Sequence, residues 1–194
     1  MDLQTKEWCH LIIFEDSRQQ LGKHTLKNTY FATHDIEVKR TKLYVGDYTL
    51  PTNQSICIDT KKDIQELIGD ICGKSHERFR NELIRAQESN IHLIILTEDN
   101  GGYCDKKNTI YNKPVTSVKD LFQWKNPRLF IMQGKKQKYP NATKGATLAK
   151  ALITMENKYG VSFKFCKKEE VGENIINILR NGADSIEQSR KAQE

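Results

Sequence analysis

The stretch VGDYTLPTNQSICIDTK, from Val45 to Lys61, predicts a β-hairpin that ends in charged residues. Tyr48 to Leu50 is the first short strand, a Pro-Thr-Asn turn follows, and Ser55 to Lys61 is the returning strand. Side chains at positions i and i+2 of a strand project from the same face. Asp59 and Lys61 are therefore expected to stand together on one face of the hairpin.

The same hairpin is expected to bring Asp47 toward Asp59, because the turn folds the chain back on itself. Two carboxylates about 4 Å apart repel by about 1 kcal/mol in water and about 4 kcal/mol in a partly shielded cleft. A divalent cation removes this cost, and Mg²⁺ binds one or two protein carboxylates while keeping several waters. The backbone carbonyl of Thr60 is a further candidate ligand, and Lys61 could hold an attacking water or a developing negative charge. Spacing alone leaves open a surface hairpin with a weak Lys-Asp pair.

The segments around the hairpin predict an α/β fold with a central mixed sheet flanked by helices. His10 to Phe14 is an apolar run followed by Glu15 to Arg18, which is typical of a buried strand with polar side chains at its carboxyl end. Lys62 to Cys72 and His76 to Glu88 have helical periodicity. Ile91 to Leu96 is a continuous apolar run, as in strands covered on both faces.

The composition is that of a soluble globular protein large enough to bury a core. The chain has 194 residues, of which 37% are hydrophobic and 29% charged, and no apolar run approaches the roughly 18 residues of a membrane span. The first residues are too polar for a signal peptide. Five scattered cysteines without a CxxC pair favour the cytoplasm over an oxidising compartment.

The net charge of +6 arises from clusters of basic residues, which suit a polyanionic partner. Each cluster alone is more typical of a solvated face than of a nucleic-acid contact, and only its combination with a catalytic site changes that interpretation. The clusters favoured as phosphate contacts are Lys39, Arg40 and Lys42, and Lys135, Lys136 and Lys138.

Three motifs in order resemble the nuclease domain of the XPF/Mus-type structure-specific endonucleases. Asp16-Ser17-Arg18 follows the first apolar strand, Val45-Gly46-Asp47-Tyr48 is present in full, and Asp59-Thr60-Lys61 stands where the family has an E-R-K triplet before a helix. The similarity covers roughly Leu11 to Glu98. The tract from Thr143 to Phe165 is also similar to the C-terminal half of compact phage or prophage members.

The resemblance implies a restriction-endonuclease-like (PD-(D/E)XK) core and hydrolysis of DNA phosphodiester bonds with Mg²⁺ or Mn²⁺. It also implies branched, flap or junction DNA as the substrate and a homodimer as the assembly. A catalytically silent DNA-binding module and a Holliday-junction resolvase are the alternatives. The implied catalytic residues are Asp47, Asp59 and Lys61 with Asp16 assisting, the metal ligands are Asp47, Asp59 and the Thr60 carbonyl, and Arg18 and Arg78 join the basic clusters as DNA contacts.

This chain departs from the family pattern at several positions. Asp59 replaces a glutamate and Thr60 an arginine, and Gln65 stands where the family has a later acid, so that Asp63 is at best a displaced substitute. Arg78 and Glu82 are four residues apart on a helix, where we expect a salt bridge between them.

The predicted organisation is an XPF-like nuclease core in residues 1–100 and a loop-rich basic connector in residues 101–142. A helix-strand-helix in residues 143–181 completes the same domain, and residues 182–194 form a polar tail. The expected location is the cytoplasm of a bacterial or phage-infected cell.

Overall fold

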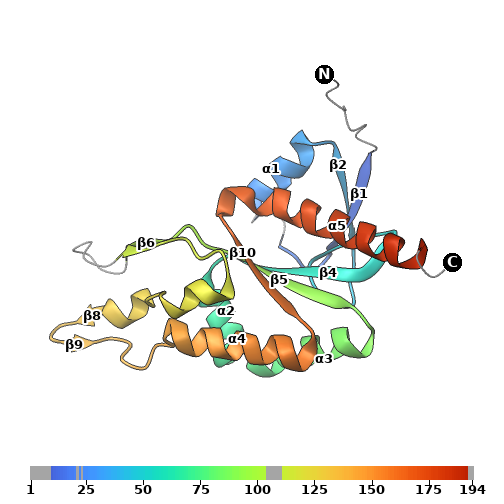
Figure 1. The fold of residues 1–194 in the computed structure, drawn as a ribbon. Coiled ribbons are helices and arrows are strands. Elements are labelled where there is room, and N and C mark those ends of the chain that lie inside the picture. The colour runs from blue at the N-terminus through green and yellow to red at the C-terminus, as the bar shows by residue number, and fades with distance from the viewer. Residues whose placement is uncertain (1–9, 21, 23, 104–110, 192–194) are drawn as a thin grey trace, which may run out of the picture.

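A mixed six-stranded sheet forms the centre of the computed structural model, which describes residues 10–20, 22, 24–103 and 111–191. Its strands are β1 (Leu11–Asp16), β2 (Ile36–Thr41), β3 (Tyr48–Leu50), β4 (Asn53–Lys61), β5 (His92–Glu98) and β10 (Ser162–Cys166). The order across the sheet is β10-β5-β4-β3-β1-β2 (Figure 1). All neighbours are parallel except β3, which is antiparallel to β1 and β4. The predicted α/β class and mixed sheet are confirmed.

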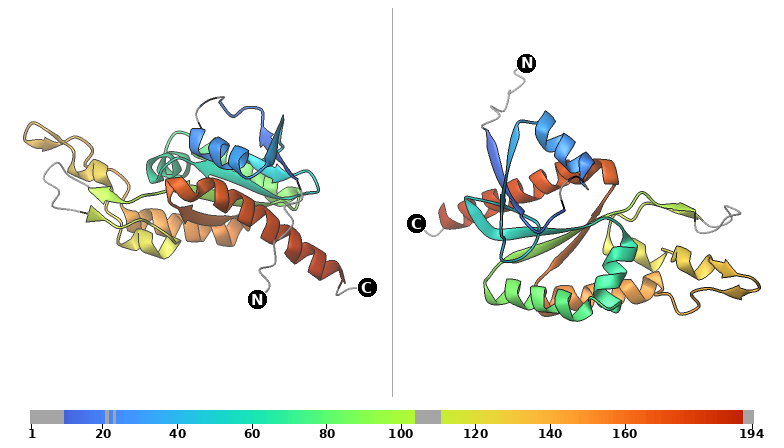
Figure 2. Two further views of the ribbon diagram at one scale, coloured as in Figure 1. Left: turned by 90° about the horizontal axis from the view of Figure 1, so that it is seen from above. Right: turned by 180° about the vertical axis from the view of Figure 1, so that it is seen from behind.

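Helices cover both faces of this sheet, as Figures 1 and 2 show. They are α1 (Thr25–Thr33), α2 (Ile64–Cys72), α3 (His76–Glu88), α4 (Gly145–Tyr159) and α5 (Val171–Lys191). One hydrophobic cluster joins α1 and α5 to one face, and the other joins α2, α3 and α4 to the opposite face. None of the helices in the described ranges combines the length and apolarity that crossing a membrane requires.

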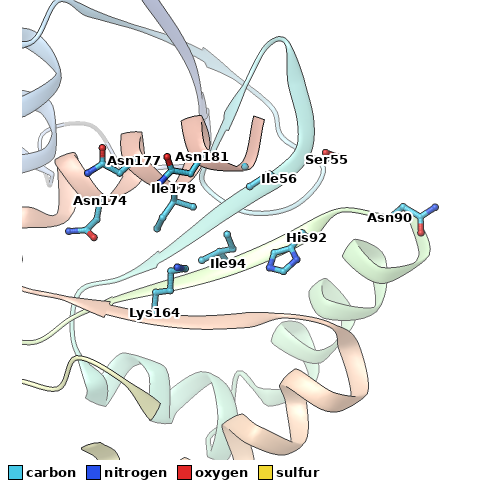
Figure 3. A pocket seen from close by; sticks show the side chains of 11 residues that line it. Ser55, Ile56, Asn90, His92, Ile94, Lys164, Asn174, Asn177, Ile178 and Asn181 are labelled. Atoms are coloured by element: carbon cyan, nitrogen blue, oxygen red, sulfur yellow. The ribbon is translucent and has the colours of Figure 1, made fainter. Parts of the chain in front are cut away.

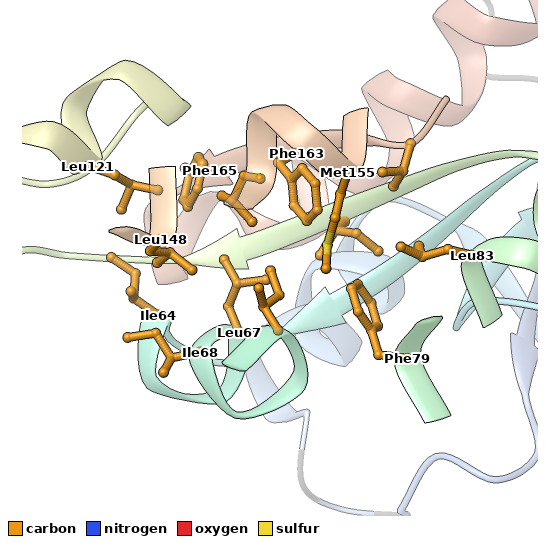
Figure 4. Packing of buried hydrophobic residues seen from close by; sticks show 14 of the residues in the cluster. Ile64, Leu67, Ile68, Phe79, Leu83, Leu121, Leu148, Met155, Phe163 and Phe165 are labelled. Atoms are coloured by element: carbon orange, nitrogen blue, oxygen red, sulfur yellow. The ribbon is translucent and has the colours of Figure 1, made fainter. Parts of the chain in front are cut away.

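The alternation of β4 explains why the sheet can be covered on both sides. Cys57 packs in the cluster of α2, α3 and α4, whereas the next residue, Ile58, packs in the cluster of α1 and α5. In Figure 4, Leu67 of α2, Phe79 of α3 and Met155 of α4 lie around the strands of this sheet. The two faces of β4 therefore lead to two separate environments.

Residues 101–103 and 111–142 form short elements. They are β6 (Gly102–Tyr103), β7 (Tyr111–Asn112), η1 (Val118–Phe122), η2 (Pro127–Phe130), β8 (Met132–Gln133) and β9 (Lys136–Gln137), where η denotes a 3-10 helix. Of these, β6, β8 and β9 project beyond the sheet (Figure 1), while Val115, Leu121 and Trp124 pack in the cluster of α2, α3 and α4. The segment predicted as loop-rich thus has its own turns and two-stranded ribbons. Part of it, residues 104–110, lies outside the described residues.

The last helix continues into the predicted polar tail, since α5 extends to Lys191. Gly182 suggests a helix end, but the helix passes through it because the missing side chain makes room for a neighbour. A Cβ atom at this position would lie 2.0 Å from Cδ1 of Ile56 on β4. Gly182 thus allows close packing of helix on strand, a role that sequence alone does not reveal.

Candidate functional site

The β3–β4 hairpin brings Asp47 beside the carboxyl end of β4. Tyr48 pairs with Ile58 in the antiparallel register, and the backbone N–H of Asp47 donates to the carbonyl of Ile58 at 2.7 Å. Oδ2 of Asp47 accepts hydrogen bonds from the backbone N–H of Thr60 at 2.8 Å and from its hydroxyl at 2.7 Å. Asp47 is therefore fixed next to the triplet that begins at Asp59.

The ammonium of Lys61 lies between two buried carboxylates, on the face of β4 that α2 and α3 cover. Its Nζ is 2.7 Å from Oδ2 of Asp59 and 2.8 Å from Oδ2 of Asp70 on α2. Burial alone would lower the pKa of Lys61, but the two carboxylates outweigh burial and raise the pKa above its ordinary value. The Lys61 ammonium is consequently charged at neutral pH.

Asp59 is the most electrostatically strained group of the site. Burial raises the pKa of its carboxyl, the Lys61 ammonium opposes this shift, and the charge of Asp47 adds to it. Oδ2 of Asp59 is near enough to Lys61 for an ion pair, yet no donor among the described residues meets it in hydrogen-bond geometry. Because a carboxylate oxygen has two acceptor positions, the ion pair with Lys61 leaves this buried oxygen with acceptor capacity.

The donor chemistry of Asp47 and Asp59 fits a hard divalent cation, since carboxylate oxygens are the ligands that Mg²⁺ and Mn²⁺ prefer. The remaining acceptor capacity of the buried Oδ2 of Asp59, beside its ion pair with Lys61, is the structural observation that supports this fit. Within the described ranges, no group of three or more His, Cys, Asp and Glu side chains has the arrangement of a metal site. An ion held here would need further oxygen ligands, such as the Thr60 carbonyl and waters.

Asp16 joins the hairpin through its backbone and is neutralised through its side chain. Its N–H donates to the carbonyl of Asp47 at 2.8 Å, which ties the end of β1 to the site. Arg18 donates to both carboxylate oxygens, from its backbone N–H at 2.7 Å and from Nε at 2.9 Å. Burial raises the pKa of Asp16, but these bonds and the Arg18 charge lower it below its ordinary value. Asp16 and Arg18 are thus an intramolecular pair at the edge of the site.

Two residues that the sequence analysis did not select support Asp47 from other elements. Gln19 donates from Nε2 to Oδ1 of Asp47. Glu82 of α3 accepts from the backbone N–H of Gly46 at 2.9 Å, and Gly46 needs its glycine because φ is +73° and a Cβ would lie 3.0 Å from the Ile58 carbonyl. The sequence signal for this role of Glu82 was its place beside Leu83, a residue on the inward face of the predicted helix.

The expected salt bridge between Arg78 and Glu82 is wrong. Glu82 turns to the hairpin instead, and Nη2 of Arg78 lies 3.6 Å from Oδ1 of Asp70. Asp70 is itself a missed site residue. Its signal was an acid on the buried face of α2, three residues after Leu67.

Lys27 of α1 is a missed residue on the other face of β4. Its side chain is 2% exposed, and its Nζ donates to Oγ1 of Thr60 at 3.0 Å. Burial lowers the pKa of Lys27, while the charges of Asp47 and Glu98 oppose this shift. A lysine four residues before the buried Phe31 was the signal for an inward ammonium.

The contacts of Asp63 are with helix α2 and not with the acids of the hairpin. Its Oδ1 accepts from the backbone N–H of Glu66 at 2.7 Å and so caps α2. Gln65, at the position of the family's later acid, donates from Nε2 to Oδ1 of Asn126 at 2.8 Å. Both residues hold α2 in place.

In the first predicted basic cluster, which is Lys39, Arg40 and Lys42, two residues contact neighbouring groups of the protein. Arg40 donates to the carbonyl of Ser17 at 3.0 Å, and its Nε is 3.2 Å from Oε2 of Glu15. Lys39 lies 3.4 Å from Glu37, and Lys42 is exposed. Arg40 is therefore committed to neighbours, whereas Lys42 is exposed to solvent.

The second cluster lies on a projecting segment, residues 131–139, which we term the basic arm. It contains β8 and β9, and Lys135, Lys136 and Lys138 are all exposed on it. Ile131 and Met132 beside them are 42% and 55% exposed. Figures 1 and 2 show the arm beyond the body, on the side toward which the parallel strands β4 and β5 run.

The chain is similar to known proteins in both sequence pattern and fold. The family model described as the ERCC4 domain matches residues 15–179. XPF from Aeropyrum pernix has 14% identity and a TM-score of 0.53, over 94% of this chain and 70% of that chain. XPF from Aeropyrum pernix in complex with DNA has 13% identity and a TM-score of 0.54, over 90% of this chain and 66% of that chain.

No curated protein matched the sequence. At these identities the structural similarity establishes the fold alone, which is that of the XPF nuclease domain and confirms the predicted restriction-endonuclease-like core. The family model spans most of the chain and includes all three motifs on which the resemblance was based. The chain therefore belongs to the ERCC4 domain family.

Proposed function

We propose that the protein is a Mg²⁺- or Mn²⁺-dependent endonuclease that hydrolyses phosphodiester bonds in branched, flap or junction DNA. The observation that carries the proposal is that the Asp59-Thr60-Lys61 triplet at the end of β4 is held by two contacts, one from Asp47 to Thr60 and one from Lys61 to Asp59. Asp47 is bonded to the N–H of Thr60 at 2.8 Å, and Lys61 lies 2.7 Å from Asp59. Membership of a nuclease family supports the same reaction class.

In this proposal Asp47, Asp59 and the Thr60 carbonyl would hold the cation. Bound there, the ion would lower the pKa of a water and offset negative charge on the phosphate oxygens. Lys61 acts as a charged donor that orients the attacking water or stabilises the transition state, because its raised pKa excludes it as a base at neutral pH. Asp16 assists by fixing the backbone of Asp47.

Phosphate contacts by exposed basic residues would orient the DNA. The exposed residues available are Lys42 and the lysines of the basic arm. Acidic or carbonyl groups of the protein already contact four of the residues predicted to bind DNA, which are Arg18, Lys39, Arg40 and Arg78. A DNA contact by any of them would have to share that partner.

The assembly and location belong to the same proposal. A homodimer and a branched substrate follow from the family resemblance, and light scattering of the purified chain tests the dimer. A cytoplasmic location rests on the scattered cysteines, of which Cys57, Cys72 and Cys166 are free thiols in the structure.

A nicking assay tests the function with labelled flap, four-way junction and plain duplex DNA, in Mn²⁺, in Mg²⁺ and in chelator. We expect metal-dependent cutting by the wild type, lost in Asp47→Asn and Asp59→Asn. Asp35→Asn is the matched control, because Asp35 is 82% exposed and its positive φ suits asparagine.

Each outcome assigns a function. Binding without cutting in all variants selects the silent DNA-binding module and rejects the endonuclease. Preferential cutting of the four-way junction selects the resolvase, and equal cutting of all three substrates rejects structure specificity.

A further inference from the structure

A cavity of about 510 Å³ lies on the face of the sheet that α1 and α5 cover, at the carboxyl end of β4. We term it the basic pocket, and its charged lining comes from α1, from the residues after β4 and β10, and from the end of β5. Carboxyl ends of parallel strands meet here, as in many ligand sites of α/β proteins. Its titratable lining residues are His24, Lys27, Lys62, Asp63, Glu98 and Lys168.

Lys27 gives this pocket a buried cation with unused donors. An ammonium has three donors, and among the described residues Thr60 Oγ1 is the one acceptor that forms a hydrogen bond with it. No carboxylate of the described residues lies within 4 Å of the Lys27 ammonium. Because a buried charge without a close counterion is costly, an anion in the pocket would be stabilised.

The charge of the lining also favours an anion. Three lysines against Asp63 and Glu98 give a formal net charge of +1, with His24 counted as neutral. Thr25 and Leu26 of the first turn of α1 line the pocket too, and no acid occupies that turn. This charge matches a single phosphodiester group.

A pocket at the opposite ends of β4 and β5 provides a comparison (Figure 3). Its volume is about 620 Å³, and Lys164 is the one lysine of its lining, among asparagines such as Asn174 and Asn177. Size therefore does not distinguish the two pockets. The cluster of lysines around a buried ammonium does.

We propose that the basic pocket binds a backbone phosphate of the DNA strand next to the bond that is cut, an inference that rests on the proposed function. Lys27 donates to this phosphate and to Thr60, whose hydroxyl donates to Oδ2 of Asp47 at 2.7 Å. Occupation of the pocket is thereby coupled to the orientation of Asp47.

The test measures binding by wild type and variants in chelator, so that no cutting is needed. Calorimetry follows inorganic phosphate in one arm and a thymidine oligonucleotide in the other. We expect Lys168→Gln and Lys62→Gln to weaken both ligands several-fold. Each is expected to lower the salt slope of binding to this single-stranded oligonucleotide by about 0.7 for the lost phosphate contact. The side chains of Lys62 and Lys168 are exposed, so these variants should fold.

Lys164→Gln is the matched control, with the same change of charge on the same sheet face outside the pocket. Equal losses in Lys164→Gln and Lys168→Gln, or unchanged binding in both, would overturn the proposal. If Lys62→Gln and Lys168→Gln lose inorganic phosphate binding but keep the salt slope of oligonucleotide binding, the pocket binds free phosphate and not a phosphate of the DNA strand. A wild type that cuts DNA while Lys168→Gln binds normally keeps the nuclease function and loses the pocket.

Discussion

Nζ of Lys61 lies 2.8 Å from Oδ2 of Asp70, and this buried ion pair joins the catalytic-motif strand β4 to helix α2. Asp59 provides the second carboxylate, 2.7 Å from the same ammonium. One lysine thus forms ion pairs with an acid of the motif and with an acid of the helix. The pair also keeps Lys61 protonated, which its proposed role requires.

Asp70→Asn should lower the free energy of unfolding by about 1–3 kcal/mol, because it leaves part of a buried charge network unsatisfied. Urea denaturation measures the change. Glu88→Gln, at an exposed position of α3, should change it by no more than about 0.5 kcal/mol. Equal stability of Asp70→Asn and wild type would show that the ion pair contributes nothing to folding.

The raised pKa of Asp59 predicts a pH dependence of stability in the metal-free protein. Folding favours the protonated carboxyl, so this contribution is complete below the ordinary carboxyl pKa and is lost as the pH rises through the raised pKa. Denaturation in chelator at about pH 5 and about pH 8 should show wild type losing stability relative to Asp59→Asn, by up to about 1.4 kcal/mol per unit of pKa difference.

Mn²⁺ at the higher pH should restore the wild type and not the variant, since a cation favours the ionised carboxylate. The pKa of Asp16 is shifted in the opposite direction, so its contribution to stability depends on pH in the opposite way. Its lowered pKa gives stability above the ordinary carboxyl pKa that is lost in more acidic solution. Parallel pH profiles of wild type and Asp59→Asn would contradict the burial of a strained carboxyl.

The hairpin was predictable because its signals are local. Alternation in β4, the turn at Pro51 and the i, i+2 relation of Asp59 and Lys61 all depend on neighbours in sequence. The class of fold followed for the same reason, since apolar runs and helical stripes mark buried strands and amphipathic helices.

The partners of the site were not predictable in this way. Asp70 and Lys27 reach β4 from helices on opposite faces, and their contacts depend on how those helices pack. The apolar run from Leu129 to Met132 is typical of a strand, but its first two residues lie in η2 for a local reason. Asn126 caps the turn and Pro127 begins a 3-10 helix there, which overrides the apolar run.

Thr60 links the two faces of the site, so its hydroxyl should couple energetically to Lys27. Thr60→Val keeps the shape of the side chain but removes the acceptor of Lys27 and a donor to Asp47. We expect a loss of about 1–3 kcal/mol in the free energy of unfolding. Combined with Lys27→Met, the two losses should fall short of additivity by about 0.5–3 kcal/mol.

Urea denaturation of the four proteins of this double-mutant cycle gives the coupling. Thr147→Val, an exposed threonine of α4, replaces Thr60→Val in a control cycle that should be additive within about 0.5 kcal/mol. Additive losses at Thr60 and Lys27 would mean that their hydrogen bond is energetically silent.

The basic arm should contribute to affinity for DNA and not to the chemical step. Lys135, Lys136 and Lys138 are exposed, and each contact with a phosphate adds about 0.9 to the slope of log affinity against log salt. Replacing all three by glutamine should therefore lower the slope by up to about 2.7 in fluorescence anisotropy titrations of flap DNA. The rate of cutting at saturating protein should stay that of the wild type, because these side chains lie apart from the acids of the hairpin.

A triple glutamine variant of exposed lysines elsewhere on the chain carries the same change of net charge and separates local contacts from a general effect. Lys119, Lys150 and Lys164 serve this purpose, since all three are exposed and none belongs to the arm or the basic pocket. Local phosphate contacts change the slope in the arm variant alone, because counterion release depends on which phosphates are neutralised. An equal change in both variants would instead mean that net charge, and not the position of the arm, sets the affinity for DNA.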